Sequence, residues 1–542
     1  MSVTTDLVRP PELDQEYRRQ GLWPQVTLAG QLRAIARDTP DRIAVIDGTD
    51  GRQVSYGRLV QDASRIAGFL CAQGVGPGDG VSVQLPNRYE TVAVDVAALM
   101  LGARLNPLLP DYRKHELSHI LRVSEARAYF TPSTYHGFDH TELADALREE
   151  LPALTTHVVV DAGPADGRIT LSDVLMADPL VDFPEPVPSA VSELIFTSGT
   201  EAHAKAVMHS EETLNHSVIA TVRHLGLGQD DVVWMPSPVG HSTGLNFGVR
   251  LALLHGLPLV LQDRWDPAAA ADLIETHRPT YTLAATTFLS DLLRVAREQG
   301  RDVSSLRSFG CGGAPVPAEL VRAAAEVGIT VLRLYGSTEG LIMSWNQPSS
   351  PQEKREMTDG VHLSDVEVQV WDEFDEPLAP GSPGELAVRG PNVCLGFFND
   401  RERTASTFTH EGWFRSGDIG TMDADGYISI VGRKKEVIIR GGLNIAPREI
   451  EDLISQMPGV LEVAVVGVPD ERLGEIVCAC VVPTGPDAVD FDRLVSFLRA
   501  RDLATYKLPQ RLRLLTQLPH TATGKIRKVE LASVARADVN NT

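Results

Sequence analysis

Apolar runs alternate with helical stretches from about residue 44 to about residue 340, and this alternation constrains the fold more than any other feature. VSVQL, LPLVL and VLRLY are apolar runs of strand length, whereas AAADLIETHR and AELVRAAAEV have helical periodicity. Strands that alternate with helices build parallel sheets covered by helices. The chain has 542 residues, 43% of them hydrophobic and 23% charged, so it is long enough for several domains. We therefore predict an α/β protein whose large N-terminal domain contains two helix-covered sheets.

The pattern changes twice toward the C-terminus. Between about 360 and 432 the helices vanish, and short strands with Gly, Pro and Asp turns predict a small β-barrel or meander. After the basic segment GRKKE, helices and strands mix again, as in PREIEDLISQM and CACVV, which indicates a compact α+β domain. We predict an N-terminal domain at 1–432, a connecting segment at 433–436 and a small C-terminal domain at 437–542.

Charge, cysteine content and hydropathy exclude several classes of protein. The 72 acidic and 50 basic residues give a formal net charge of -22, the wrong sign for binding nucleic acid or anionic lipid. Five cysteines without metal-ligand spacing fit reduced thiols and a cytoplasmic location, and the polar N-terminus is not a secretory signal. TVAVDVAALMLGARLNPLLP is interrupted by Asp95 and Arg104, so we predict a core helix and no membrane span.

Two motifs in the α/β region are typical of phosphate and nucleotide sites. TSGT at 197–200 follows the apolar run ELIF and precedes a helical stretch, which predicts a strand-to-helix turn that can grip phosphate. YGSTEG at 335–340 offers an aromatic face for a base, a hydroxyl, and the carboxylate of Glu339 for Mg²⁺ that bridges phosphates. Each motif alone also fits an ordinary glycine-bounded turn.

Three C-terminal segments carry further candidates. WFRSGDIG places Asp418 in a turn, where its carboxylate could accept both ribose hydroxyls or only cap the turn. GRKKEVIIRGGLNIAPREIE combines a basic turn, a strand, a glycine pair and a helix opened by proline, which also fits a plain interdomain linker. LPHTATGKIRK sets Lys525 beside glycine, where its charge could meet a phosphate or carboxylate or remain an exposed tail lysine.

Together, in this order and spacing, the motifs resemble the motif series of the adenylate-forming superfamily, which includes acyl-CoA ligases, carrier-loading adenylation domains and firefly-type luciferases. The resemblance runs from about Tyr17 to Lys528. It implies that a carboxylate and ATP form acyl-AMP and pyrophosphate, after which the small C-terminal domain rotates and a thiol attacks the adenylate. TSGTE and PSPVGHSTG are most similar to ligases for alicyclic or medium-sized aliphatic acids.

The resemblance implies a role for each motif residue in the adenylation step. Thr338 would contact the α-phosphate and Glu339 the Mg²⁺. Asp418 and Arg433 would bind the ribose, because a carboxylate accepts from two hydroxyls and a guanidinium donates to them. Lys525 would bridge the carboxylate and the α-phosphate, stabilising the charge that grows as pyrophosphate leaves. The other nucleotide-binding residues would be Thr197, Ser198, Gly199, Thr200 and Lys205 at the phosphates, and Gly313, Ala314, Pro315, Tyr335, Gly336 and Ser337 around the adenine.

The same resemblance implies the residues of the thiol step. Lys435 would be the hinge, at a position where the family more often has Asp. His241 matches an aromatic gate between acyl pocket and thiol tunnel, although a core or capping histidine would look the same. Gly441 and Gly442 would line the pantetheine tunnel, because only a missing side chain lets a ligand pass so close to backbone. The acyl pocket would include Leu245, Phe247 and Thr286.

The substrate classes follow from what the motifs lack. PSPVG holds no Asp at the position where amino-acid-activating members bind an α-ammonium, so we expect a plain carboxylic acid, such as an alicyclic or terpenoid acid of natural-product biosynthesis. No carrier domain follows within the chain, so we expect free CoA as the thiol. The enzyme would act as a monomer or homodimer.

The phosphate loop departs from the usual pattern of the superfamily, roughly Ser/Thr-Ser-Gly-Thr-Thr-Gly-x-Pro-Lys-Gly. Glu201, Ala202, Ala204 and Ala206 stand where that pattern has Thr, Gly, Pro and Gly. A Cβ at 202 and 206 would cost ~1 kcal/mol each if the loop needs left-handed backbone there. The Glu201 carboxylate near the triphosphate would cost roughly 3 kcal/mol at ~5 Å.

This penalty acts only on adenylation, because the β- and γ-phosphates exist only in that step. Our hypothesis is that thioester formation from acyl-AMP and CoA is intact while ATP-dependent adenylation is weak or lost, so that a separate adenylating enzyme supplies the acyl-AMP. The alternatives are an ordinary two-step ligase, a catalytically silent binding relative, and a luciferase-like oxygenase or carrier-loading enzyme.

Overall fold

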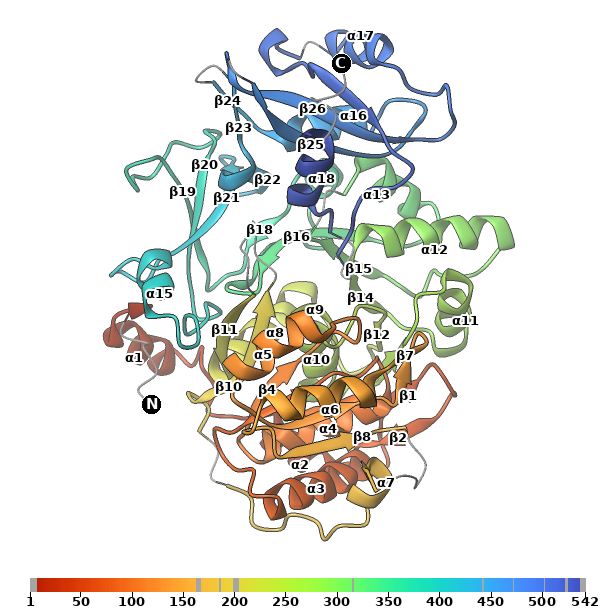
Figure 1. The fold of residues 1–542 in the computed structure, drawn as a ribbon, viewed down its shortest axis with the longest axis vertical. Coiled ribbons are helices and arrows are strands. Elements are labelled where there is room, and N and C mark those ends of the chain that lie inside the picture. The colour runs from red at the N-terminus through yellow and green to blue at the C-terminus, as the bar shows by residue number, and fades with distance from the viewer. Residues whose placement is uncertain are drawn as a thin grey trace.

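The computed structural model describes residues 7–161, 167–184, 187–197, 204–313, 316–440, 443–470, 472–501, 503–521 and 525–536. In this part of the chain, two large sheets form the N-terminal region, a four-stranded sheet follows, and a five-stranded sheet lies near the C-terminus. Figure 1 shows the C-terminal elements at one end of the molecule and the N-terminal sheets at the other.

The first large sheet has a parallel centre and antiparallel edges. Its parallel strands pair because helices connect them, as the alternation of apolar runs and helical stretches predicts. In order across the sheet, the strands are β18 (Val361–His362), β17 (Leu341–Trp345), β16 (Val331–Ser337), β15 (Ser308–Gly312), β14 (Tyr281–Ala284), β12 (Val233–Met235), β13 (Leu259–Leu261), β1 (Ile43–Asp47) and β2 (Gln53–Ser55).

The second large sheet is parallel except at one edge, where β11 runs antiparallel to β10. Its strands in order are β11 (Lys205–Ser210), β10 (Val191–Thr197), β4 (Arg104–Pro107), β3 (Gly80–Val83), β5 (Ala126–Thr131), β8 (Thr156–Val159) and β9 (Ile169–Thr170). The two strands joined between Thr197 and Lys205 are therefore antiparallel. The predicted strand-to-helix turn is wrong, because the stretch after the loop pairs with β10 and the helix begins only at Glu211.

Helices cover both sheets. They are α2 (Leu28–Asp38), α3 (Tyr56–Ala72), α4 (Tyr89–Met100), α5 (Lys114–Val123), α6 (His140–Glu150), α7 (Leu171–Val174), α8 (Glu211–Leu225), α9 (Ser242–Gly244), the π-helix η2 (Leu245–Arg250), α10 (Leu251–His255), α11 (Pro267–His277), α12 (Thr286–Gln299), α13 (Ala318–Ala325) and α14 (Gln352–Met357). The predicted core helix is α4, in which ten of twelve residues are buried. Among the described residues, no helix is long and apolar enough to cross a membrane.

The region 360–432 forms a meander rather than a helix-free barrel. Four antiparallel strands follow one another in sequence order: β19 (Glu367–Trp371), β20 (Gly384–Arg389), β21 (Phe414–Met422) and β22 (Ile428–Arg433). The expectation that helices vanish here is wrong at α15 (Arg401–Thr407), where the Asp400 side chain accepts from the Arg403 N–H and caps a short helix.

The C-terminal region has the predicted mixture of helices and strands. Its sheet contains β24 (Leu443–Ile445), β23 (Ile438–Arg440), β26 (Gly474–Pro483), β25 (Val460–Asp470) and β27 (Arg511–Leu514), and its helices are α16 (Pro447–Ile454), α17 (Phe491–Arg499) and α18 (Lys528–Arg536). Cys478 and Cys480 are buried on β26, and every cysteine is free. The short helix α1 (Pro11–Arg19) lies beside the meander (Figure 1).

Candidate functional site

Thr338 and Glu339 lie in the turn between β16 and β17, and both side chains are buried. A Cβ on Gly336 would overlap the carbonyl oxygen of Leu341, so only glycine fits where the two strands meet. Leu341 itself adopts a left-handed conformation with φ 50°. The sequence therefore closes YGSTEG into a tight hairpin that presents one hydroxyl and one carboxylate side by side.

Side chains and backbone from other elements hold this turn through its carbonyl groups. His209 Nε2, on β11, donates to the Thr338 carbonyl at 2.7 Å, because a carbonyl can only accept. The Cys394 N–H donates to the Glu339 carbonyl at 2.8 Å. Burial lowers the pKa of His209 to about 4, so its imidazole is neutral at physiological pH. The turn is thus fixed in place by groups that no motif contains.

Lys205 and Glu339 form an ion pair between the first residue of β11 and the turn after β16. Burial disfavours the charged Glu339, but the Lys205 ammonium outweighs it and lowers the pKa of that carboxyl. A single buried carboxylate suits Mg²⁺, which keeps several waters and takes its other ligands from phosphates. Glu339 is therefore the residue that would hold a nucleotide-bound Mg²⁺, and no cluster of three or more metal-ligating side chains occurs in the described residues.

Asp418, Arg433 and Tyr335 meet in one hydrogen-bonded group. Arg433 Nε lies 3.0 Å from Asp418 Oδ1, and the Tyr335 hydroxyl donates to Asp418 Oδ2 at 2.8 Å. Burial raises the pKa of Asp418, and the Arg433 guanidinium partly offsets this. The prediction that Asp418 lies in a turn is wrong: it lies inside β21, directly opposite Arg433 on β22, because the meander pairs these strands. This pairing aligns the carboxylate and guanidinium without any help from a turn.

Lys525 reaches this group from the C-terminal region. Its N–H donates to Thr521 Oγ1 at 3.1 Å and its carbonyl accepts from the Thr521 N–H at 2.7 Å, which places Lys525 at the base of a tight turn. A Cβ on Gly313 would lie 3.4 Å from Lys525 Cε, so the side chain passes over that glycine. Although Lys525 keeps accessible surface, crowding by protein and the charge of Arg433 lower the pKa of its ammonium, while Asp418 and Glu339 oppose this change.

His241 is the N-cap of α9, where its Nδ1 accepts from the Thr243 N–H at 3.3 Å. Burial, followed by the nearby charge of Lys525, lowers the pKa of His241 to about 4. The neutral ring therefore carries its proton on Nε2. The capping role considered from the sequence is present, and the ring also lies close enough to Lys525 to sense its charge.

The predicted acyl-pocket residues come from two elements. Leu245 and Phe247 are buried on η2, and Thr286 begins α12, with its hydroxyl 3.6 Å from Cys311 Sγ. The π-helix packs against α8, β12 and β14. The π-helix therefore lies against the same large sheet that contains β16.

The segment around Lys435 joins the two halves of the molecule. Lys435 lies in the short 3-10 helix η3 (Lys434–Glu436). On one side, Lys434 Nζ lies 2.7 Å from Glu385 on β20, and on the other, Lys528 Nζ lies 3.2 Å from Glu436. Ion pairs thus attach this segment both to the meander and to α18.

Some of the predicted site residues fall in stretches of the chain that the structure does not describe, and two of their neighbours are described. Ser198, Gly199, Thr200, Glu201, Ala202, Ala314, Pro315, Gly441 and Gly442 lie outside the described residues. Thr197 ends β10 directly opposite Lys205, and Gly313 has a left-handed φ of 77°.

Ala206 does not adopt the left-handed backbone conformation that the motif pattern led us to consider. It lies within β11, opposite Phe196, and its carbonyl accepts from the Phe398 N–H at 2.9 Å. This strand backbone suits any L-residue, so a Cβ at this position carries no left-handed penalty. The free-energy cost of left-handed backbone that we considered at Ala206 therefore does not apply. Hydrogen bonds on both edges of β11 hold this residue in the extended conformation.

Comparisons with known proteins agree with this arrangement. The chain belongs to the AMP-binding enzyme family, whose main domain it matches over residues 32–398 and whose C-terminal domain it matches over residues 449–525. A medium-chain fatty-acid–CoA ligase of Escherichia coli (strain K12) is 38% identical over 94% of this chain and 91% of that enzyme. A 2-hydroxy-7-methoxy-5-methyl-1-naphthoate–CoA ligase of Streptomyces carzinostaticus is 32% identical over 97% of this chain and 96% of that enzyme.

The fold is also shared with solved structures. ATP-bound MatB from Rhodopseudomonas palustris is similar with a TM-score of 0.85 and 29% identity, covering 94% of this chain and 99% of that one. The predicted α/β fold and family are therefore confirmed, and the chain is an enzyme of the acid–thiol ligase type.

Sequence reasoning missed two groups of buried polar residues. The first consists of His209 and the Thr338 carbonyl. In the sequence, only the presence of a histidine inside the apolar strand AVMHS indicates a buried polar contact there. The second is a cluster around Arg250, which lies between Glu193 and Glu211. A single polar residue in an apolar run reveals burial, but its partners lie far away in the sequence.

Replacing His209 tests its hold on the Thr338 carbonyl. Because a lost partner leaves that buried carbonyl unsatisfied, at a cost of about 1–2 kcal/mol, we expect His209→Leu to lower kcat/KM for an acyl adenylate roughly tenfold. His209→Gln keeps an N–H at a similar reach and should restore most of the activity. Steady-state kinetics of both variants check this, and equal losses in the two would contradict it.

The free energy of unfolding of wild type and of His209→Gln should depend differently on pH. The folded-state pKa of His209 is about 4, below its ordinary 6.5, so the stability that its neutral form contributes is complete above pH 6.5 and is lost as the pH falls toward 4. Between pH 7 and pH 5, wild type should therefore lose about 1–2 kcal/mol more than His209→Gln. Urea titrations at both pH values measure the difference.

Proposed function

We propose that this enzyme forms an acyl-CoA thioester from acyl-AMP and CoA, and that its ATP-dependent adenylation is weak or lost. The charge balance of the site supports this. Three cations and two carboxylates leave one net positive charge, which matches the single negative charge of an acyl adenylate; these groups are Lys205, Lys525, Arg433, Glu339 and Asp418. Mg-bound ATP brings more negative charge, and Glu201, four positions before Lys205 in the sequence, would add another carboxylate.

The thioester step follows from these positions. The CoA sulfur forms a bond to the acyl carbon, the carbon–oxygen bond of the mixed anhydride breaks, and AMP leaves with the electron pair while the thiol proton passes to solvent. Asp418 and Arg433 hold the ribose, and Thr338 faces the phosphate. His241 Nδ1 is already occupied by the Thr243 N–H, so we assign His241 to the gate and not to proton transfer.

In the proposed domain arrangement, one face of the C-terminal domain serves adenylation and another face serves thioester formation. We take 1–432 and 437–542 as the two domains, with Lys435 in the hinge at 433–436, and we propose that Lys525 serves adenylation from its position beside Gly313. Rotation would withdraw Lys525 and bring Gly441 and Gly442 to the CoA tunnel. The ion pairs of Lys434 and Lys528 beside the hinge would then have to rearrange.

The acid that we propose is a non-amino carboxylic acid, alicyclic or terpenoid. Leu245 and Phe247 supply an apolar lining, and Ser237–Gly240 offers no carboxylate for an ammonium group. We further propose a cytoplasmic location, which suits the five free cysteines, and a separate adenylating enzyme as the source of acyl-AMP.

An ordinary two-step ligase is the second candidate. The position of Lys525 beside Gly313 favours it, because that lysine is the one implied to act in adenylation. The two functions separate in one experiment: candidate acids with ATP and Mg²⁺ are followed by pyrophosphate release, and synthetic acyl-AMP with CoA is followed by thioester formation. Thioester without pyrophosphate supports the first candidate, rapid pyrophosphate release supports the second, and absence of thioester rejects both.

Lys525→Ala distinguishes the two half-reactions within this enzyme. We expect the residual pyrophosphate release to fall by about 10², since a positioned charge contributes about 2.7–4 kcal/mol to such a step. Thioester formation from acyl-AMP should stay within about threefold, because the lysine is withdrawn in that step. Parallel assays with the exposed Lys114→Ala as control check this; equal losses in both half-reactions would contradict the division of roles.

A further inference from the structure

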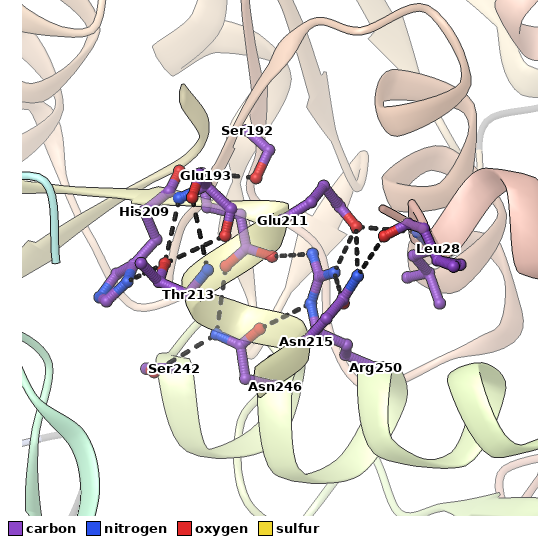
Figure 2. Close-up of polar contacts among 12 residues, drawn as sticks. Leu28, Ser192, Glu193, His209, Glu211, Thr213, Asn215, Ser242, Asn246 and Arg250 are labelled. Atoms are coloured by element: carbon purple, nitrogen blue, oxygen red, sulfur yellow. Dashed lines mark hydrogen bonds and ion pairs between the residues drawn. The ribbon is translucent and has the colours of Figure 1, made fainter. Parts of the chain in front are cut away.

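Arg250 is a buried cation within a cluster of polar side chains from β10, α8 and η2 (Figure 2). Its side chain is 1% exposed, and the two carboxylates that it binds are also buried. Nη2 lies 2.6 Å from Glu193 Oε1, Nη1 lies 2.9 Å from Glu211 Oε2, and Nε donates to Asn246 Oδ1 at 3.0 Å. Arg250 is the last residue of η2, so its guanidinium joins η2 to β10 and α8.

The element that ends at Arg250, η2, has an uncommon geometry. Leu245–Arg250 is a π-helix, a wider turn than an α-helix and one that is frequent at functional sites. Asn246 Nδ2 donates to Glu193 Oε2 at 3.1 Å and to Ser242 Oγ at 3.4 Å, so the cluster also reaches the residue after His241. A Cβ on Gly248 would lie 2.6 Å from Met235 Cγ, which shows how closely η2 packs on β12. The π-helix is therefore fixed by polar contacts to β10 and α8 and by close packing against β12.

We propose that Arg250 is a positioning residue that sets which acids fit, by holding the π-helical turn of Leu245 and Phe247 against β10 and α8. This inference rests on the proposed function, because it takes those two side chains as the lining of the acyl pocket. Without the fork of Arg250, η2 can shift toward ordinary α-helical pitch, and every side chain on it turns relative to β12. Pocket shape, rather than nucleotide binding, is then what changes.

The electrostatics of the cluster decide which variants are informative. Burial opposes the charge of Arg250, yet Glu211 and Glu193 raise the pKa of its guanidinium, so it stays charged. Burial also raises the pKa of Glu193 and of nearby Asp95, whose carboxyl oxygens have no hydrogen-bond partner in the described part of the chain. Removing the cation would leave these carboxyls facing one another, so a neutral residue at 250 risks unfolding the enzyme.

Two milder variants reduce that risk. Arg250→Lys keeps the charge but cannot bind both carboxylates and Asn246 at once, because a lysine lacks the planar fork. Asn246→Ala leaves the ion pairs of Arg250 with both glutamates, and it removes the bonds that Asn246 makes with Arg250, Glu193 and Ser242. The matched control is Arg88→Lys, whose arginine also forks onto a carboxylate, Asp263, through Nε and Nη2 at 3.1 and 2.9 Å.

The test measures selectivity. Wild type and variants receive octanoyl-AMP or cyclohexanecarbonyl-AMP with CoA, and the ratio of the two kcat/KM values is compared. We expect Arg250→Lys and Asn246→Ala to change this ratio by about tenfold, the scale of a misfitting group in an apolar pocket, while Arg88→Lys leaves it unchanged. Unchanged ratios with lower absolute rates would show a merely structural role and overturn the inference; if Arg250→Lys does not fold, Asn246→Ala decides.

Failure of the proposed function is a separate outcome. If wild type converts the acids only with ATP, the same ratio is taken from the two-step reaction. If no thioester forms at all, the proposed function is rejected, and the ratio of dissociation constants for the two acyl adenylates, from calorimetry, takes its place. In each case a shifted ratio supports the role of Arg250 and an unshifted ratio rejects it.

Discussion

Pyrophosphate release from ATP and the acid substrate should rise by about 10³ in the variant Glu201→Thr, Ala202→Gly, Ala204→Pro. The reason is the loss of roughly 3 kcal/mol of repulsion between Glu201 and the triphosphate, together with about 1 kcal/mol of backbone cost at Ala202. Thioester formation from acyl-AMP should change little, since that substrate has no β- or γ-phosphate. Both half-reactions are measured on the same preparation.

The structure supplies the control for this experiment. Ala206 lies in β11 with its methyl group buried, so Ala206→Gly alone should give no gain in pyrophosphate release. It should instead lower stability by about 0.5–1 kcal/mol, because glycine loses more backbone freedom in a strand. A gain from Ala206→Gly, or no gain from the triple variant, would contradict the proposed effect of these loop residues on adenylation.

Asp418→Ala should lower kcat/KM for acyl-AMP by about 10²–10³. The carboxylate is the acceptor proposed for both ribose hydroxyls, and charge-assisted hydrogen bonds contribute about 1.5–3 kcal/mol each. The change also leaves Arg433 and the Tyr335 hydroxyl without their shared partner. The effect should appear with every acyl chain alike, because the nucleotide part is common to all of these substrates.

Asp375→Ala is the matched control for this second experiment. Asp375 also belongs to the meander and also binds an arginine, Arg415, but at an exposed position. Its loss should leave kcat/KM within about twofold, as is usual for surface ion pairs. If both aspartate variants behave alike, the loss at Asp418 would reflect damage to the sheet, and the ribose role would be rejected.

The fold was largely predictable because its local patterns are strong. Parallel strands connected by helices follow from apolar runs such as VLRLY and helical stretches such as AELVRAAAEV. Errors occurred where strand pairing overrides local appearance. Asp418 and Ala206 look like turn and loop residues in sequence, but β22 and the segment at 395–398 pair with their strands.

The candidate site divides in the same way. The motifs around Thr338, Asp418 and Lys525 are readable in the sequence, because each carries its chemistry within a few adjacent residues, and their order identifies the family. Only the tertiary structure brings His209 to the Thr338 carbonyl and Arg250 to Glu193 and Glu211. These contacts join residues 39 to 129 positions apart. Such pairs come from the packing of whole elements, which no local periodicity records.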